Sequence, residues 1–157
     1  DRDIRDANRA LAIVATDIAM GEKIVLTQGI VADAVVASTC IPGIFVPLEH
    51  EKGFLVDGGV MENVPVPSLK ALGADYMIGV NLNSCHSADK PENIVEVLMN
   101  TFSLWMHNAT ELQTEKADLL IAPDLSQYNV YDTRQSADLI ETGYRQAQQQ
   151  LDEFFDQ

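Results

Sequence analysis

One short stretch of the sequence, Val56 to Pro67 (VDGGVMENVPVP), holds the residues best suited to chemistry. Asp57 follows a short apolar run and precedes Gly58 and Gly59, which let the backbone bend sharply. A carboxylate at the end of a buried strand can accept a proton from a nearby hydroxyl, and partial burial raises its basicity. The same spacing also fits a hairpin turn whose carboxylate bonds nearby N–H groups. Spacing alone leaves both interpretations open.

The histidines offer weaker candidates for chemistry. His50 stands beside charged residues and a glycine, which favours an exposed loop, and His107 is expected to be a packing or surface residue of a helix. Cys85 and His86 are neighbours in a polar stretch, but two ligands without a second pair are a weak signal for a metal. We therefore predict no metal site and no cofactor.

Short apolar runs alternate with segments of helical periodicity along the chain, which predicts an α/β protein with a mainly parallel sheet flanked by helices. Long helices are expected near residues 92–117 and 134–155, and the apolar stripe of the first, from Ile94 to Leu112, is expected to lie in the core. In the second, Arg145 to Gln150 apart from Ala147 is expected to face solvent. Strands are expected at 11–15, 24–29, 54–56, 76–82 and 119–122, with shorter helices at 30–38 and 67–72.

Composition limits the classes of partner. The 157 residues carry 24 acidic and 10 basic side chains, so the formal net charge of -14 opposes binding to nucleic acid. Cys40 and Cys85 show no CxxC spacing, which is typical of reduced thiols in a reducing compartment. We expect a cytoplasmic protein, with a transient contact to a membrane surface as a further expectation.

Several segments carry a family resemblance when they are taken in order. They are LAIVATDIAMGEKIVLTQG, ASTCIPGIFVP, VDGGVMENVPV, LGADYMIGVNL and the closing ETGYRQAQQQLDEF. In this order and spacing the chain resembles the C-terminal half of patatin-like phospholipases, above all bacterial members and neuropathy-target-esterase-like proteins. The resemblance implies a patatin-like three-layer fold that is incomplete in this chain.

The resemblance also implies a mechanism. The family uses a Ser–Asp dyad, and its D-G-G or D-G-A motif maps onto Asp57, Gly58 and Gly59, with Asp57 as the base that activates the serine. An ester of a lipid or lipid-like substrate would be hydrolysed through an acyl-enzyme. Supporting roles fall to Asn63 after the Asp57 turn and to Pro42 and Gly43 at the bend after the preceding helix. Asp17 and Gly21 match a structural strand-end turn, whereas Phe45 and Val46 fit either an acyl pocket or core packing.

The nucleophile of this family lies in a G-x-S-x-G elbow, and the sequence contains no such pattern. The serines that lack the elbow are Ser38, Ser68, Ser84, Ser87, Ser103, Ser126 and Ser136. We therefore expect residues 1–157 to be the C-terminal part of a single patatin-like domain, with the nucleophile on an absent N-terminal segment. That segment is the expected partner, and the chain alone is expected to be inactive and to self-associate.

Two other functions remain open at this stage. One is a non-catalytic interaction or regulatory module that retains the patatin-like fold. The other is a nucleotide-binding α/β protein, which ranks lowest because both G-x-G-x-x-G and a P-loop are missing.

Overall fold

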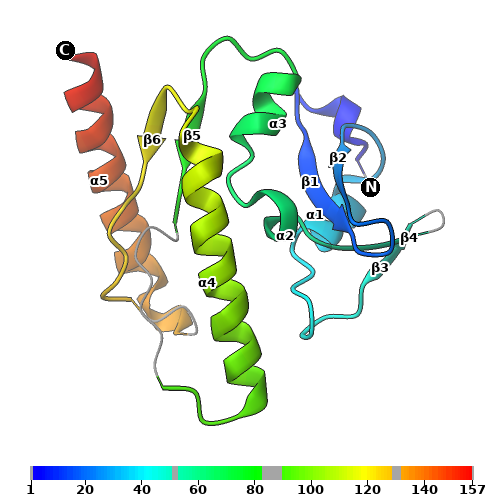
Figure 1. Cartoon of the computed structure of the whole chain (residues 1–157). Coiled ribbons are helices and arrows are strands. Elements are labelled where there is room, and N and C mark those ends of the chain that lie inside the picture. Colours follow the sequence, from blue (N-terminus) through cyan, green and yellow to red (C-terminus); the bar gives the residue numbers. More distant parts are fainter. Residues whose placement is uncertain (1, 51–52, 83–89, 129–131, 157) are drawn as a thin grey trace. The chain divides into compact units, whose positions relative to one another are not determined.

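The computed structural model describes residues 2–50, 53–82, 90–128 and 132–156. The chain forms two compact units, Asp1–Ser68 (the N-terminal unit) and Leu69–Gln157 (the C-terminal unit) (Figure 1). None of the helices in the described ranges is long and apolar enough to cross a membrane.

A four-stranded sheet in the order β2-β1-β4-β3 forms the centre of the N-terminal unit. Its strands are β1 (Ile13–Asp17), β2 (Glu22–Leu26), β3 (Leu48–His50) and β4 (Gly53–Asp57). The helices of this unit are η1 (Ile4–Asp6), α1 (Val31–Ser38), α2 (Gly59–Glu62) and α3 (Val66–Ala71), the last of which runs across the boundary between the units.

All three pairings in this sheet are antiparallel, so the expected mainly parallel sheet is wrong for the N-terminal unit. Only residues 18–21 separate β1 from β2, and such a short connection can join antiparallel strands but cannot make a parallel crossover. The parallel sheet was predicted because β1 is buried on both faces, and a continuous apolar run is the usual sign of a parallel strand. Strand β3 was missed as well.

The two faces of the sheet bury different sets of residues, which follow from the register. Ala15 lies opposite Asp57, and Asp17 lies opposite Leu55, so their side chains share one face. On that face Ala15 and Leu55 pack with Ala37 of α1, and the aliphatic side chains around this cluster are Ile24, Leu26 and Leu48. The opposite face carries Thr16 and Val56, which are both buried. Asp57 therefore belongs to the face that α1 covers.

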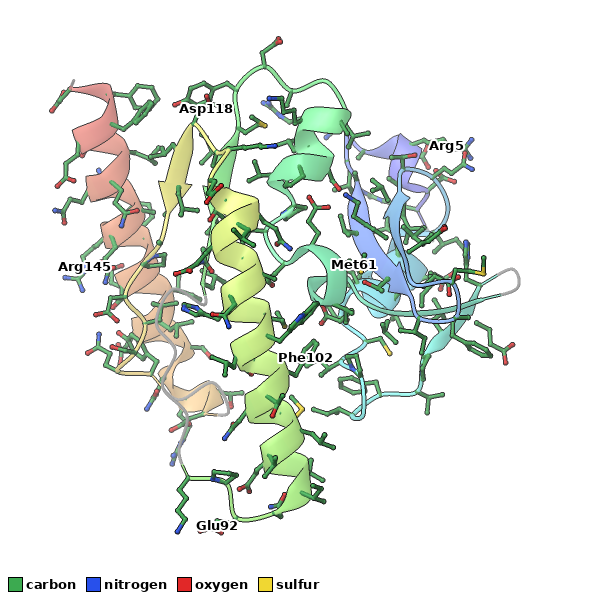
Figure 2. The ribbon with its side chains drawn as sticks, in the orientation of Figure 1. Arg5, Met61, Glu92, Phe102, Asp118 and Arg145 are labelled. Carbon is green, nitrogen blue, oxygen red and sulfur yellow. The ribbon has the colours of Figure 1, made fainter. Side chains whose placement is uncertain are left out.

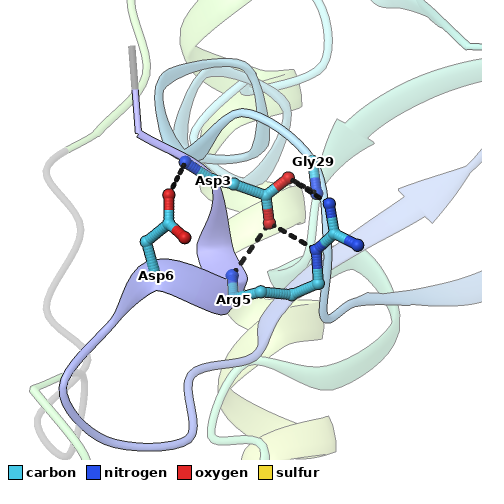
Figure 3. Close-up of polar contacts among 4 residues, drawn as sticks. All are labelled: Asp3, Arg5, Asp6 and Gly29. Atoms are coloured by element: carbon cyan, nitrogen blue, oxygen red, sulfur yellow. Dashed lines mark hydrogen bonds and ion pairs between the residues drawn. The ribbon is translucent and has the colours of Figure 1, made fainter.

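The N-terminal segment is fastened to the turn between β2 and α1. The carboxylate of Asp3 accepts hydrogen bonds from the Arg5 backbone and guanidinium and from the N–H of Gly29 (Figure 3). The N–H of Ile4 donates to the carbonyl of Gly29 over 2.8 Å. The guanidinium of Arg5 holds the pKa of Asp3 well below its usual range.

The C-terminal unit contains a β-α-β arrangement. Strands β5 (Ile78–Val80) and β6 (Leu119–Ile121) pair in parallel, and α4 (Ile94–Thr114) connects them along the chain. Asp118, labelled in Figure 2, joins the two strands at their start, because its carboxylate accepts the N–H of Met77 over 2.7 Å. The unit ends with η2 (Thr133–Gln135) and α5 (Ser136–Phe155).

The long helices confirm the predicted bounds but not the predicted packing. The α4 stripe was expected in the core, yet Ile94, Leu98 and Leu112 are 70%, 63% and 71% exposed. The residues that α4 buries are Thr110 and Thr114. Two strands offer little surface for a helix of this length to cover, so the stripe stays open to solvent in this structure.

The glutamines of α5 were expected to face solvent, and two of them instead bind backbone. The side-chain oxygen of Gln150 accepts the N–H of Ala122 over 3.1 Å, and that of Gln146 accepts the N–H of Asp124 over 2.7 Å. These bonds satisfy two backbone N–H groups of the segment that follows β6. Hydrophobic periodicity contains no signal for such contacts.

Candidate active site

Asp57 is the last residue of β4, as expected for a strand-end carboxylate. Its N–H donates to the carbonyl of Cys40 over 2.9 Å, and the N–H of Gly58 donates to the carbonyl of Ser38 over 3.4 Å. These bonds bring the end of α1 and the residues after it beside the end of β4. Backbone bonds on a buried sheet therefore fix the position of the Asp57 main chain.

A glycine is required at position 58 because the chain after β4 passes close to the backbone of β1. A Cβ at this position would overlap the carbonyl oxygen of Val14 on β1 and would lie 2.8 Å from its carbonyl carbon. The obstacle is backbone in the middle of a sheet and cannot move aside. Gly58 therefore allows the chain to pass close to β1 between the end of β4 and the start of α2.

The carboxylate of Asp57 is half-buried and sparsely bonded. Among the residues that the structure describes, its hydrogen-bond donor is the N–H of Gly59, 2.8 Å from Oδ1, and Oδ2 accepts none. Burial raises the pKa of Asp57 above its ordinary value, and the Gly59 bond opposes that shift only in part. A carboxylate with raised basicity and an unengaged oxygen can accept a proton from a hydroxyl.

The hairpin alternative for Asp57 is wrong, because helix α2 and not a strand follows it. The local bond that this alternative expected is nevertheless present, since the carboxylate accepts the Gly59 N–H at the start of α2. Asn63 directly follows α2 with helical backbone angles. The residue thus lies after the turn, as the sequence indicated.

The expected bend at Pro42 and Gly43 is present. Gly43 has φ +84°, a left-handed conformation that favours glycine, and the N–H of Phe45 closes the turn on the carbonyl of Ile41. Buried Cys40 ties this turn to the site, because its thiol donates to the carbonyl of Val46 while its own carbonyl accepts from Asp57. Phe45 and Val46 are exposed, so the core-packing alternative for them is wrong in this structure.

A buried carboxylate beyond the motif escaped the sequence analysis. Glu62, the last residue of α2, accepts hydrogen bonds from Lys23 Nζ at 2.6 Å and from the N–H and Oγ of Ser68 at 2.8 and 2.6 Å. Burial acts to raise the pKa of Glu62, but Lys23 and Ser68 outweigh it and hold the pKa below the ordinary value. Because the charged donor Lys23 belongs to β2, 39 positions away, spacing around Glu62 gave no signal of the ion pair.

Asp17 has the structural role that the sequence indicated. Its carboxylate accepts the N–H groups of Ala19 and Met20 at 2.8 and 3.2 Å, in a turn where Gly21 has φ +70°. Burial acts to raise the pKa of Asp17, but these N–H groups, the Phe54 backbone and the charge of His50 hold it below the ordinary value. His50 is half-buried at the end of β3, so the loop expected for it is wrong.

The remaining candidates have other roles or positions in the described residues, or lie outside them. Ser68 is buried against Glu62, and Ser38 contributes its carbonyl to Gly58. His107 lies on α4 in the C-terminal unit. Cys85, His86, Ser84 and Ser87 lie outside the described residues. Within the described ranges, no cluster of three or more His, Cys, Asp or Glu residues could hold a metal ion.

Comparison with known proteins finds a family match in the first part of the chain. Residues 1–70 match the family described as "Patatin-like phospholipase", and this range includes Asp57, Gly58 and Gly59. An uncharacterized NTE family protein of Mycobacterium tuberculosis (strain ATCC 25618 / H37Rv) is 31% identical over 90 residues, which are 55% of this chain and 25% of the relative.

Two further relatives extend the comparison. A second uncharacterized NTE family protein of the same strain is 26% identical over 160 residues, covering 86% of this chain and 27% of the relative. Lysophospholipase NTE1 of Phaeosphaeria nodorum is 31% identical over 93 residues, 57% of this chain and 6% of that protein. The chain thus spans about a quarter of the length of the mycobacterial relatives. These matches make residues 1–70 similar to patatin-like phospholipases and the chain similar to proteins of the NTE family.

Proposed function

We propose that Asp57 is the general base of a lipid acyl hydrolase that works through a Ser–Asp dyad. The observation that carries the proposal is the half-buried Asp57 carboxylate at the end of β4, with a raised pKa and one oxygen that accepts no hydrogen bond from the described residues. The relationship to patatin-like phospholipases and to a protein named lysophospholipase supports ester hydrolysis as the reaction.

The chemistry assigned to Asp57 consists of two proton transfers in each half of the reaction. As the serine oxygen bonds to the ester carbonyl carbon, Asp57 accepts the hydroxyl proton, and it then gives that proton to the departing alcohol. Water attacks the acyl-enzyme in the second half, and Asp57 accepts a proton from the water and returns it to the serine. The products are an alcohol and a carboxylic acid.

The serine of this dyad is proposed to come from a part of the protein outside these 157 residues, since the G-x-S-x-G pattern does not occur in them. The greater length of the relatives is compatible with such a segment. The β5–β6 pair gives independent support. Parallel strands are normally buried on both faces, yet Ile78 and Val80 are about half exposed.

The proposed substrate class is a lipid ester, and the net charge of the chain bears on how the protein contacts a lipid surface. With a net charge of -14, an electrostatic grip on anionic lipid is unfavourable, so membrane contact is proposed to be transient and peripheral. Neutral or zwitterionic lipid esters are therefore better suited as substrates than strongly anionic ones.

Fluorophosphonate labelling tests the source of the nucleophile. The 157-residue chain alone should hydrolyse no fluorogenic ester and take up no probe, and it should self-associate in size-exclusion chromatography. The longer natural protein, or the chain co-expressed with the preceding region, should hydrolyse the ester and label at one serine. Replacing that serine by alanine is the control.

Two results would overturn parts of the proposal. Probe uptake by the 157-residue chain alone would mean that a nucleophile lies within it. A longer protein that contains the elbow, folds and yet neither labels nor hydrolyses any lipid ester would favour a non-catalytic module.

A further inference from the structure

The bonds around Glu62 point to a function beyond stability. Glu62 is 4% exposed, and its carboxylate receives three hydrogen bonds, one of them from the ammonium of Lys23. The Lys23 side chain is 33% exposed, but Glu62 is buried, so removing a partner of Glu62 leaves its charge desolvated and less well paired, which is costly. This set of bonds connects three elements, β2 through Lys23, α2 through Glu62 and α3 through Ser68.

Helix α2 cannot maintain its own position. It has four residues, Gly59–Glu62, and a single helical turn is unstable in isolation because nucleation costs more than one turn returns. Its first residue, Gly59, donates to the Asp57 carboxylate, and the N–H of Glu62 returns to the carbonyl of Gly58 over 2.8 Å. The helix thus touches the candidate base at one end and the buried Glu62 set at the other. Figure 2 labels Met61 on this helix.

We propose that Glu62, fixed by Lys23 and Ser68, is a positioning residue for Asp57 that acts through α2 and the N–H of Gly59. This inference rests on the proposed function of Asp57. Glu62 touches no reacting atom in the proposed reaction. It holds the turn of helix that aims Oδ1 of Asp57 at the Gly59 N–H and leaves Oδ2 for the serine hydroxyl.

A purely structural role for Glu62 predicts a different pattern of effects. A structural residue would lower the amount of folded enzyme and depress every activity alike, with or without Asp57. A positioning residue should lower kcat through Asp57 alone, with KM little changed, because misplacement of a reacting group acts on the chemical step. The two roles separate in a double-mutant cycle.

The experiment uses the longer natural protein that contains these residues, with a fluorogenic ester as the probe substrate. Glu62→Gln keeps the shape of the side chain but removes the charge that Lys23 meets. In the parent protein it should lower kcat about 10- to 100-fold, with KM changed by less than about 3-fold. In an Asp57→Asn background it should change the residual rate by less than about 2-fold. Rates are referred to folded protein, measured by thermal unfolding.

Milder variants keep the test valid if Glu62→Gln does not fold. Ser68→Ala removes the hydroxyl donor while the Ser68 N–H remains, and it should lower kcat about 2- to 5-fold, again only when Asp57 is present. Lys23→Arg keeps a charged donor and should preserve more activity than Lys23→Met. Asp17→Asn is the matched control, because Asp17 is also a buried carboxylate of this unit but does not bond to Glu62, Lys23 or Ser68. It should leave kcat within about 2-fold of the parent.

The outcomes separate the two claims. If Glu62→Gln or Ser68→Ala lowers kcat equally in both backgrounds, or leaves it unchanged in the parent, the positioning role is wrong while Asp57 can still be the base. If Asp57→Asn itself keeps near-normal turnover, the proposed function fails, and the positioning role fails with it.

Discussion

Two neighbouring strands of the same sheet end in an aspartate, and the two ends differ in chemistry. Strand β1 ends at Asp17 and β4 ends at Asp57, and the strands are antiparallel, so the two residues lie at opposite ends of the three-residue pairing between them. Both side chains share the face that α1 covers. Yet the pKa of Asp17 is held below the ordinary value, whereas that of Asp57 is raised.

The backbone that follows each aspartate explains the difference. After Asp17 the chain curls back through Gly21 into β2, and two N–H groups of that turn point at the carboxylate. After Asp57 the chain passes over Val14 into α2, and one N–H reaches the carboxylate. Burial penalises both charges, and the number of donors decides which pKa falls. The turn that follows a strand-end aspartate thus determines how many N–H groups its carboxylate accepts and in which direction its pKa shifts.

The largest contrast is expected in catalysis. In the longer natural protein, Asp57→Asn should lower ester hydrolysis by about 10²- to 10⁴-fold, because the amide is nearly isosteric but cannot accept the serine proton. Asp17→Asn should keep turnover within about 2-fold of the parent while it lowers the thermal unfolding midpoint, since it disturbs a turn that the carboxylate organises. Steady-state kinetics and thermal unfolding of both variants measure the contrast.

Circular dichroism of Asp57→Asn is the control, and it should match the parent. Near-normal turnover of Asp57→Asn on the best substrate would remove Asp57 from the mechanism. Equal loss of activity in the two variants would erase the distinction between the two strand ends.

The next contrast concerns stability. It compares Gly58, which follows Asp57 in the sequence, with Gly53, whose backbone lies against the Asp17 side chain. Gly58→Ala should destabilise the protein by about 1–3 kcal/mol or more, because its Cβ meets the backbone carbonyl of Val14. Gly53→Ala places its Cβ on the carboxylate of Asp17, a side chain that can rotate away when its turn bonds are given up. We expect a smaller loss there, measured by urea unfolding.

Double mutants test which atoms obstruct each added Cβ. Asp17→Ala should recover part of the loss in Gly53→Ala, because it removes the colliding atoms, and it should recover nothing in Gly58→Ala. Full additivity at Gly53, or recovery at Gly58, would mean that the obstacles have been assigned wrongly.

The sequence predicted element positions well where periodicity and punctuation agree. The bounds of α4 and α5 came from apolar spacing, and β4 with the Asp57 turn came from GFLV followed by two glycines. The structural role of Asp17 and the bend at Pro42 and Gly43 were also expected, because turn chemistry is local and leaves its residues side by side in the sequence.

Long-range pairing could not be read in the same way. The antiparallel sheet depends on which strands meet, and the apolar run of β1 looks the same for either direction. Glu62 gave no signal because its charged partner Lys23 lies 39 positions away. The exposed stripe of α4 was unpredictable for a related reason, since periodicity marks an apolar face without identifying what covers it.

The smallest contrast concerns the pH dependence of stability, and its sign should be opposite for the two aspartates. The folded protein holds the proton of Asp57 more tightly than the unfolded chain does. The stability that this difference contributes is present below about pH 4 and is lost as the pH rises through the folded-state pKa. Asp17 has a lowered pKa, so its contribution is present above about pH 4 and is lost as the pH falls through its folded-state value.

Urea unfolding between about pH 3 and pH 7 of the parent, Asp57→Asn and Asp17→Asn measures these contributions as differences from the parent. The advantage of the parent over Asp57→Asn should shrink as the pH rises, and its advantage over Asp17→Asn should grow. Each substitution removes one titrating group, so the pH dependence of each difference isolates that group. Slopes of the same sign would contradict the assignment, because one carboxylate would then be satisfied differently from the structure. Opposite slopes would agree with burial as the cause of the raised pKa of Asp57, and with the N–H groups of the Asp17 turn as a cause of its lowered pKa.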